Sequence, residues 1–192
     1  MHAYEKIPLN TAGFVLAAFI IGLHLWMILQ STAAIDFFKK FPRNTALGRV
    51  LMTIGLAWFW LLVINGSPIT MELNDFNGLK PILLFVVPIV GFFIIKDVKE
   101  FLAVRGLGVV MLMAAAPLLA AAWQEPNQFK FLLPLYAYGM IIKGLFCVGM
   151  PYYLRDMINW ATATPSRFRF LSLAGLAYGI AVLSCALMFW GA

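Results

Sequence analysis

The chain has 192 residues, of which 63% are hydrophobic and 11% charged, and its mean hydropathy is +0.91. This balance lies far outside that of a soluble domain and indicates an integral membrane protein. A net charge of +6 would suggest nucleic acid as the partner of a soluble protein. Here the Lys and Arg residues lie between the apolar runs, where membrane insertion explains them, so we expect no nucleic-acid partner.

Six apolar runs are each long enough to cross a bilayer, which takes roughly 20 helical residues for about 30 Å of hydrocarbon. None has the alternating pattern of a β-barrel strand. The predicted fold is therefore an all-α membrane protein, a bundle of six transmembrane helices forming a single domain over residues 1–192. The predicted spans are 11–30, 47–64, 79–95, 101–123, 129–154 and 168–190.

The first connection, residues 31–46, mixes bulky aromatic residues with Lys39, Lys40 and Arg43. This mixture is typical of an interfacial turn or a short amphipathic helix. The sequence Asn65-Gly-Ser-Pro predicts a turn after the second span, and residues 96–100 predict a tight charged connection after the third.

The orientation follows from the distribution of basic residues. Ten of the fourteen Lys and Arg residues fall within or beside the connections 31–46, 96–100 and 155–167. By the positive-inside rule these connections face the cytoplasm and both termini face outward. The expected location is a cell membrane, in particular a bacterial inner membrane, which the chain crosses several times. We expect the first span to be retained rather than removed as a signal peptide.

A weak repeat runs through the three cytoplasmic connections. They contain Asp36, Asp97 and Asp156, at separations of 61 and 59 residues, each followed by an aromatic residue and then an arginine. One interpretation is a fold of three repeated helical hairpins. The alternative is that hairpins of similar length with basic connections look alike through topology alone, because side-chain identity within the spans is low.

Lys143 is the main candidate for a functional residue, since a charged side chain within a span costs roughly 2.5 to 3.5 kcal/mol on insertion scales. It lies twelve residues before Arg155, about 18 Å along a helix, and so should not easily reach the inner surface. Tyr136 lies on the same helix face. The functional roles are an anion or carboxylate site, a proton-coupled step, or an ion pair with a neighbouring subunit. The structural alternatives are bonding to carbonyls or hydroxyls within the bundle, or snorkelling toward water.

His24 is the second titratable residue within a span. It lies twelve residues before Asp36, and Lys143 lies thirteen before Asp156, which predicts similar depths for the two. A histidine can ligate haem, carry a proton or contact a quinone. The only other histidine is His2, at the terminus, which makes ligation by two histidines difficult. The pattern favours a packing role, with haem or quinone contact as the alternative.

Smaller signals concern packing. The pairs Gly175 with Gly179 and Ala18 with Gly22 have the spacing that membrane helices use for close contact, and we interpret both pairs as packing positions. The two cysteines, Cys147 and Cys185, lie within predicted spans without the spacing of a redox pair, and are expected to be buried thiols.

Signatures of catalysis are missing. The sequence contains no HExxH, GxSxG, CxxC or P-loop motif, and its eight carboxylates fall at helix ends or in connections. We therefore expect no metal site and no catalysis by this chain alone.

The function predicted is that of an accessory or structural subunit of a larger membrane assembly, which includes a non-catalytic subunit of an enzyme complex. Its partners would be other membrane subunits, copies of itself and lipids. The alternative is a small transporter or channel with Lys143 in the pathway. A third interpretation is a subunit of an electron-transfer complex that contacts a quinone or another cofactor, with His24 as the candidate.

Overall fold

The structure is a computed structural model that describes residues 4, 7–64, 70–71, 74–98, 100–123, 125–126 and 128–190. All regular structure in this part of the chain is helical, which confirms the all-α prediction. His2, Lys99 and the turn predicted at 65–68 lie outside the described residues.

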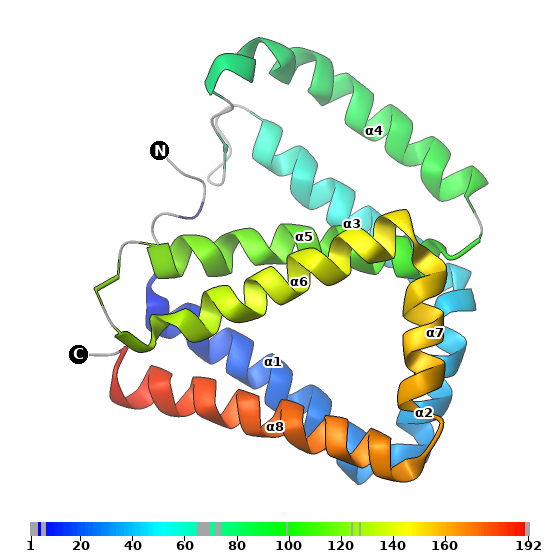
Figure 1. The fold of residues 1–192 in the computed structure, drawn as a ribbon. Helices are drawn as coiled ribbons and strands as arrows, with labels where there is room; N and C mark the ends of the chain where they lie inside the picture. The colour runs from blue at the N-terminus through cyan, green and yellow to red at the C-terminus, as the bar shows by residue number, and fades with distance from the viewer. Residues whose placement is uncertain are drawn as a thin grey trace.

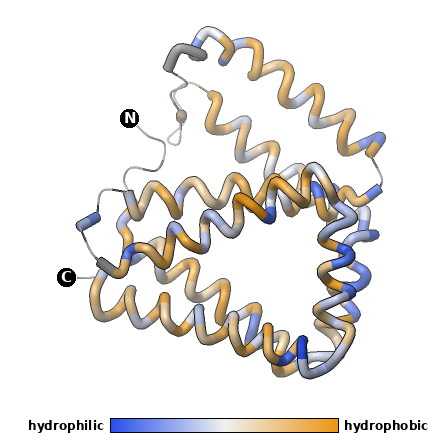
Figure 2. The backbone as a smooth tube through the Cα atoms, viewed as in Figure 1, coloured by the Kyte–Doolittle hydropathy of each residue, from blue (hydrophilic) through white to orange (hydrophobic). Residues whose placement is uncertain are grey.

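Six helices of the described part are long and apolar enough to cross a membrane, which confirms the six predicted spans and a multi-pass membrane protein. They lie roughly along one direction (Figure 1), and Figure 2 shows that most of their residues are hydrophobic. The six helices are α1 (Leu9–Leu29), α3 (Thr45–Val63), α4 (Lys80–Asp97), α5 (Leu102–Trp123), α6 (Leu132–Gly149) and α8 (Pro165–Met188).

Two shorter helices, α2 (Ser31–Lys40) and α7 (Pro151–Ala161), run across one end of the bundle and pack against each other (Figure 1). Both are amphipathic, as residues of a membrane interface usually are. The short amphipathic helix predicted in 31–46 is thus confirmed. Three 3-10 helices complete the structure: η1 (Phe41–Arg43), η2 (Asn74–Leu79) and η3 (Gln128–Phe131).

The helix α7 corrects the sequence analysis. The fifth span, predicted over 129–154, ends at Gly149, and much of the connection predicted at 155–167 is helical. The chain leaves the helical conformation at Met150, with φ −129° and ψ 66°, and Pro151 opens the new helix. Proline suits the first turn of a helix because it has no N–H to leave unpaired there, whereas in a helix interior it breaks a hydrogen bond.

The first and last thirds of the chain repeat each other at an offset of 120 residues. Gln30 ends α1 with φ −124° and ψ 54°, close to the angles of Met150 after α6. Asn44 and Thr164 then cap α3 and α8, each side chain accepting a hydrogen bond from the backbone N–H three residues later. Each of these pairs is 120 residues apart. We call residues 9–63 the first half of this repeat and residues 129–183 its second half.

The sequence carries the same repeat weakly. At this offset, the segment 49–58, RVLMTIGLAW, aligns with 169–178, RFLSLAGLAY. The middle hairpin, α4 and α5, joins through residues 98–101 and has no interfacial helix in the residues described there. Two of the three predicted hairpins therefore share their architecture, and the third does not share the interfacial helix.

The spans pack through small residues. The helix α5 lies between α3 and α6, while α1 packs against α8. A Cβ atom added at Gly48 would lie 2.5 Å from the backbone nitrogen of Ala103, and one at Gly108 would lie 2.8 Å from the carbonyl oxygen of Gly144. Approaches this close between helix backbones need residues without side chains.

The predicted small-residue pair of α8 is confirmed, because added Cβ atoms at Gly175 and Gly179 would both run into α1. The pair predicted in α1 is wrong. Gly22 is exposed, and an added Cβ there would have no described atom within 4 Å. The contact of α1 with α8 instead uses Gly13, where an added Cβ would lie 3.2 Å from the Cβ of Ala186 on α8 and 2.5 Å from the ring of Trp190, which follows α8.

The helix α4 is the least buried of the six spans, and among them it packs chiefly on α3. Pro88 lies within it and has no N–H, so the carbonyl of Leu84 loses its helical donor. The indole Nε1 of Trp60, on α3, donates to that carbonyl oxygen at 3.0 Å. Since lipid offers no substitute donor, this hydrogen bond both satisfies the proline site and attaches α4 to α3.

Candidate functional site

The described apolar core is divided between the two ends of the bundle. The cluster away from α2 and α7 joins α1, α5, α6 and α8, and we call it the outer cluster. The cluster near α2 and α7, the inner cluster, joins η1, α5 and α6 through Phe41, Ala103, Val104 and Cys147. Members of the outer cluster are Leu9, Ala12, Leu16, Ala17, Ile20, Ala121, Ala122, Leu133, Val182, Ala186 and Trp190.

Tyr136, one of the three predicted candidates, lies beside the outer cluster. Its ring stacks on that of Tyr178 with the centroids 5.9 Å apart, and the Tyr178 hydroxyl donates to the carbonyl oxygen of Leu132 at 2.5 Å. These contacts join α6 to α8 toward the end of the bundle opposite α2 and α7, and they give Tyr136 a packing role.

His24 lies between α1 and α8. Its Nδ1 is 2.8 Å from the carbonyl oxygen of Ile20, and since a carbonyl only accepts, Nδ1 carries the proton and donates. Its Nε2 faces Gly175, where an added Cβ would lie only 1.9 Å away. Both ring nitrogens thus face protein, and an iron at Nε2 would require α1 and α8 to separate. This geometry favours the packing role over haem ligation.

Lys143 lies nearer the end of its span than the sequence analysis expected. Because α6 ends at Gly149, Lys143 is six residues, or about 9 Å, from that end, instead of about 18 Å. The residue is exposed, and its aliphatic stem can carry the ammonium toward the interface. The expectation that Lys143 cannot easily reach the inner surface was therefore wrong.

His24 and Lys143 lie at similar depths, as the sequence predicted. His24 is five residues from the end of α1 and Lys143 six from the end of α6, and in the repeat His24 is equivalent to Gly144, the neighbour of Lys143. No hydrogen bond or ion pair connects the two, and Lys143 makes neither with any residue that the structure describes.

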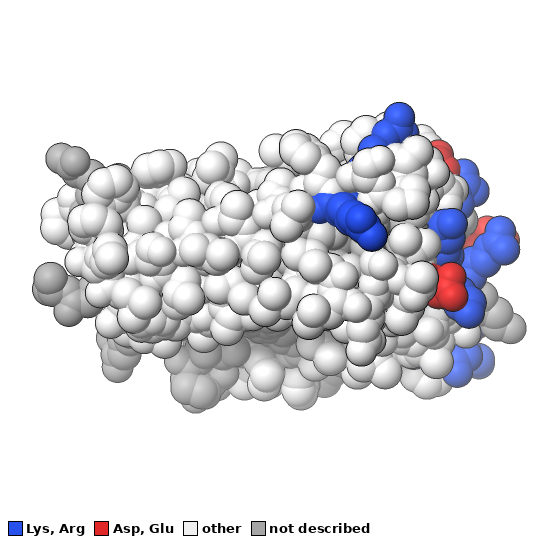
Figure 3. All heavy atoms as spheres, turned by 90° about the horizontal axis from the view of Figure 1, so that it is seen from below, with Lys and Arg blue, Asp and Glu red and all other residues white. Residues whose placement is uncertain are grey.

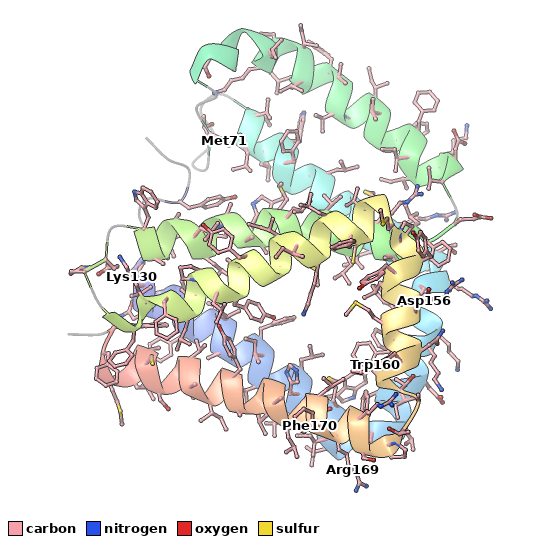
Figure 4. All side chains as sticks on the ribbon, viewed as in Figure 1. Met71, Lys130, Asp156, Trp160, Arg169 and Phe170 are labelled. Atoms are coloured by element: carbon pink, nitrogen blue, oxygen red, sulfur yellow. The ribbon has the colours of Figure 1, made fainter. Side chains whose placement is uncertain are left out.

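Most of the charged residues that the structure describes lie at the end of the bundle where α2 and α7 are. The face in Figure 3 carries Lys, Arg, Asp and Glu toward one end and none along most of its length. Figure 4 shows Asp156 and Trp160 on α7 and Arg169 near the start of α8 at this end, with Lys130 at the opposite end. Arg155 pairs with Asp156 at 2.9 Å, and the Arg167 guanidinium lies 5.3 Å from the ring of Trp160. This arrangement is typical of a membrane interface.

No cluster of three or more His, Cys, Asp or Glu residues that could hold a metal ion occurs in the described part of the chain. Cys147 is buried, Cys185 is partly buried, and both are free thiols. The structure thus brings none of the three predicted candidates into a catalytic group with another.

A second region of interest was not predicted from the sequence. Between α3 and α4 lies a cavity of about 320 Å³. Its few polar groups are Thr53 and the indole N–H of Trp60, which is already donated to Leu84. The cavity therefore suits an apolar group. Its lining residues are Thr53, Leu56, Ala57, Trp60, Val87, Pro88, Gly91, Phe92 and Ile95.

Comparisons of this chain with protein-family models, with curated proteins and with solved structures find no match.

Proposed function

We propose that the protein is an accessory or structural subunit of a larger membrane assembly and that it binds a transmembrane helix of another subunit at α3 and α4. The observation that carries this proposal is the loose attachment of α4, which is held chiefly by α3. Its outward residues are large and apolar, with Phe85 72% exposed and Phe93 54% exposed. The cavity between α3 and α4 offers a partner side chain a place to pack.

Close packing drives helix association in membranes, because lipid tails are as apolar as the helices themselves. A bulky apolar side chain of a partner helix would fill the α3/α4 cavity and gain contacts that lipid chains make less well. In this proposal the chain itself performs no catalysis. Its role is to hold other subunits, including those of an enzyme complex, in the membrane.

Photocrosslinking in native membranes tests the proposal. A photoreactive residue replacing Phe85 or Phe93 on α4 should crosslink to one discrete protein partner, and the same residue at Leu173, an exposed position of α8, should not. Val87→Trp, which fills the cavity, should weaken co-purification of that partner in mild detergent. Purification of a lone monomer with no α4 crosslink would contradict the proposal.

The second candidate is a small transporter or channel with Lys143 in its pathway. It is favoured by the exposed ammonium without a described partner and by the repeated halves, since several transporter families are built from such repeats. Lys143→Met should then abolish flux in liposomes while leaving the protein folded. Contact with a quinone or another cofactor through His24 ranks third, because both ring nitrogens of His24 face protein.

We also propose the orientation, with α2, α7 and residues 96–100 on the cytoplasmic side of a bacterial inner membrane and both termini outside. The excess of Lys and Arg at that end of the bundle supports it. In a variant without native cysteines, Gly78→Cys should react with an impermeant thiol reagent in intact cells, and Ser166→Cys should react only after lysis. The reverse labelling pattern would overturn the orientation.

A further inference from the structure

The face of α6 that carries Lys143 turns toward α8. Leu132 and Tyr136 contact Tyr178 of α8 at the outer end, and Lys143 follows Tyr136 by seven residues, two helical turns, so both point to the same side. Toward α7, however, α6 and α8 diverge (Figure 1). A Cβ added at Gly139, one turn before Lys143, would have no described atom within 4 Å. Lys143 thus faces open, lipid-accessible space.

The opposite wall of this space is apolar. Ala174 and Leu171 precede Tyr178 on α8 by one and two turns, so they share its side of the helix, and both are exposed. At the cytoplasmic edge, where α7 meets α8, Arg167 lies over the ring of Trp160. The space therefore combines apolar walls with a cation on α6 and a second cation at its edge.

The ammonium of Lys143 would be stabilised by an anion, because a charge within a transmembrane segment is stable only with a partner or with water. None of the eight carboxylates of the sequence lies within the interior of a span. A second copy of the chain would lack a carboxylate at this depth for the same reason. Apart from an acidic residue of another subunit, which the co-purification outcome below tests, the source of negative charge at a lipid-facing surface is the phospholipid headgroup.

We infer that Lys143 binds the phosphate of an anionic phospholipid of the cytoplasmic leaflet, whose acyl chains lie between α6 and α8 along Gly139, Leu171 and Ala174. The side chain of Lys143 extends toward the interface by snorkelling, and an ammonium and a phosphate form a charge-assisted hydrogen bond. Lipid phosphates also attract basic residues next to the membrane surface, so Arg167 at the edge of the space would add to the attraction of anionic lipids.

Native mass spectrometry of the full chain in detergent tests this inference, with phosphatidylglycerol and phosphatidylcholine of identical acyl chains as probes. Wild-type protein should retain phosphatidylglycerol several-fold better than phosphatidylcholine. Lys143→Met should remove that preference and Lys143→Arg should keep it. Lys39→Met, which removes an exposed cation of α2, is the matched control and should change the preference little.

Gly139→Phe provides an independent variant, because it fills the open space while leaving the charge in place. It should lower retention of both lipids, with the thermal unfolding temperature close to that of the wild type. Equal loss in Lys39→Met and Lys143→Met would overturn the inference in favour of diffuse attraction. Retention of oleate but not of phosphatidylglycerol, or loss of a co-purifying protein in Lys143→Met, would also overturn it. The crosslinks from α4 should persist in every variant, which separates this site from the proposed subunit function.

Discussion

The first half of the repeat, residues 9–63, and the second half, residues 129–183, follow the same path but have different neighbours. Each half consists of a span, a short interfacial helix and a second span whose N-terminus is capped by a side chain. Yet α3 packs against α5, whereas its equivalent α8 packs against α1. Gly48 on α3 lies against the backbone of α5, and the equivalent residue of α8 is the buried Phe168. The ends of the helices thus keep the repeat, while their faces have adapted to whichever helix lies beside them.

The largest effect is expected when α3 receives a side chain at a position where α8 has one. Gly48→Leu should prevent α5 from approaching α3, because even a Cβ would meet the backbone at 2.5 Å and 2.8 Å and backbone atoms cannot move aside. We expect a loss of about 3 kcal/mol or more, since overpacking usually costs about 1 to 3 kcal/mol. Unfolding in detergent, followed by circular dichroism, measures the effect. Gly139→Leu is the matched control and should cost far less.

The equivalent glycines Gly55 and Gly175 distinguish the two halves further, because different side chains of the neighbouring helices pack against them. Gly55 faces Val109 of α5, and Gly175 faces the ring of His24. Gly175→Ala should destabilise the protein by about 2 kcal/mol through overpacking, and His24→Ala should recover much of that loss by removing the ring. A double-mutant cycle gives the coupling energy. Independent, additive effects would show that the ring and the glycine do not pack together.

The attachment of α4 belongs to the first half alone, since Ile180 stands at the position equivalent to Trp60. Trp60→Phe removes the donor to the Leu84 carbonyl and should cost about 1 kcal/mol, typical of a hydrogen bond between membrane helices. Hydrogen exchange of the backbone near Pro88 should increase, with little change in α8. Unchanged exchange in α4 would show that packing alone holds it.

The smallest effect should be the same in the two halves. Asn44→Ala and Thr164→Ala each remove a side chain that accepts a hydrogen bond at a helix start, and each should cost about 1 kcal/mol. The two losses should agree within about 0.5 kcal/mol and add together in the double variant, because the caps are independent sites. A large loss from only one cap would contradict the equivalence of the two helix starts.

The sequence was sufficient for the class and the number of spans, because length and hydropathy determine both. It failed at α7. Residues 150–154, Met-Pro-Tyr-Tyr-Leu, continue the fifth apolar run without a charged residue, and the absence of charge does not distinguish a helix that crosses the membrane from one that bends onto its surface. The depth assigned to Lys143 was wrong for that reason.

The contact of His24 with Gly175 could not be predicted either. It joins residues 151 positions apart in the chain, and no local pattern indicates which spans become neighbours. The repeated Gly-Leu-Ala at 55–57 and 175–177 was a usable signal that both glycines matter. It gave no indication that one of them receives a histidine.

The pairing of α1 with α8 also has a consequence for biogenesis. During synthesis α1 leaves the ribosome well before α8, so the face of α1 that carries His24 and Gly13 lacks its partner until α8 has been translated. Folding that depends on such distant contacts is slow and leaves incomplete surfaces exposed. Nascent chains stalled before residue 165 should therefore hold α1 loosely at the insertion machinery, and its release should coincide with the arrival of α8.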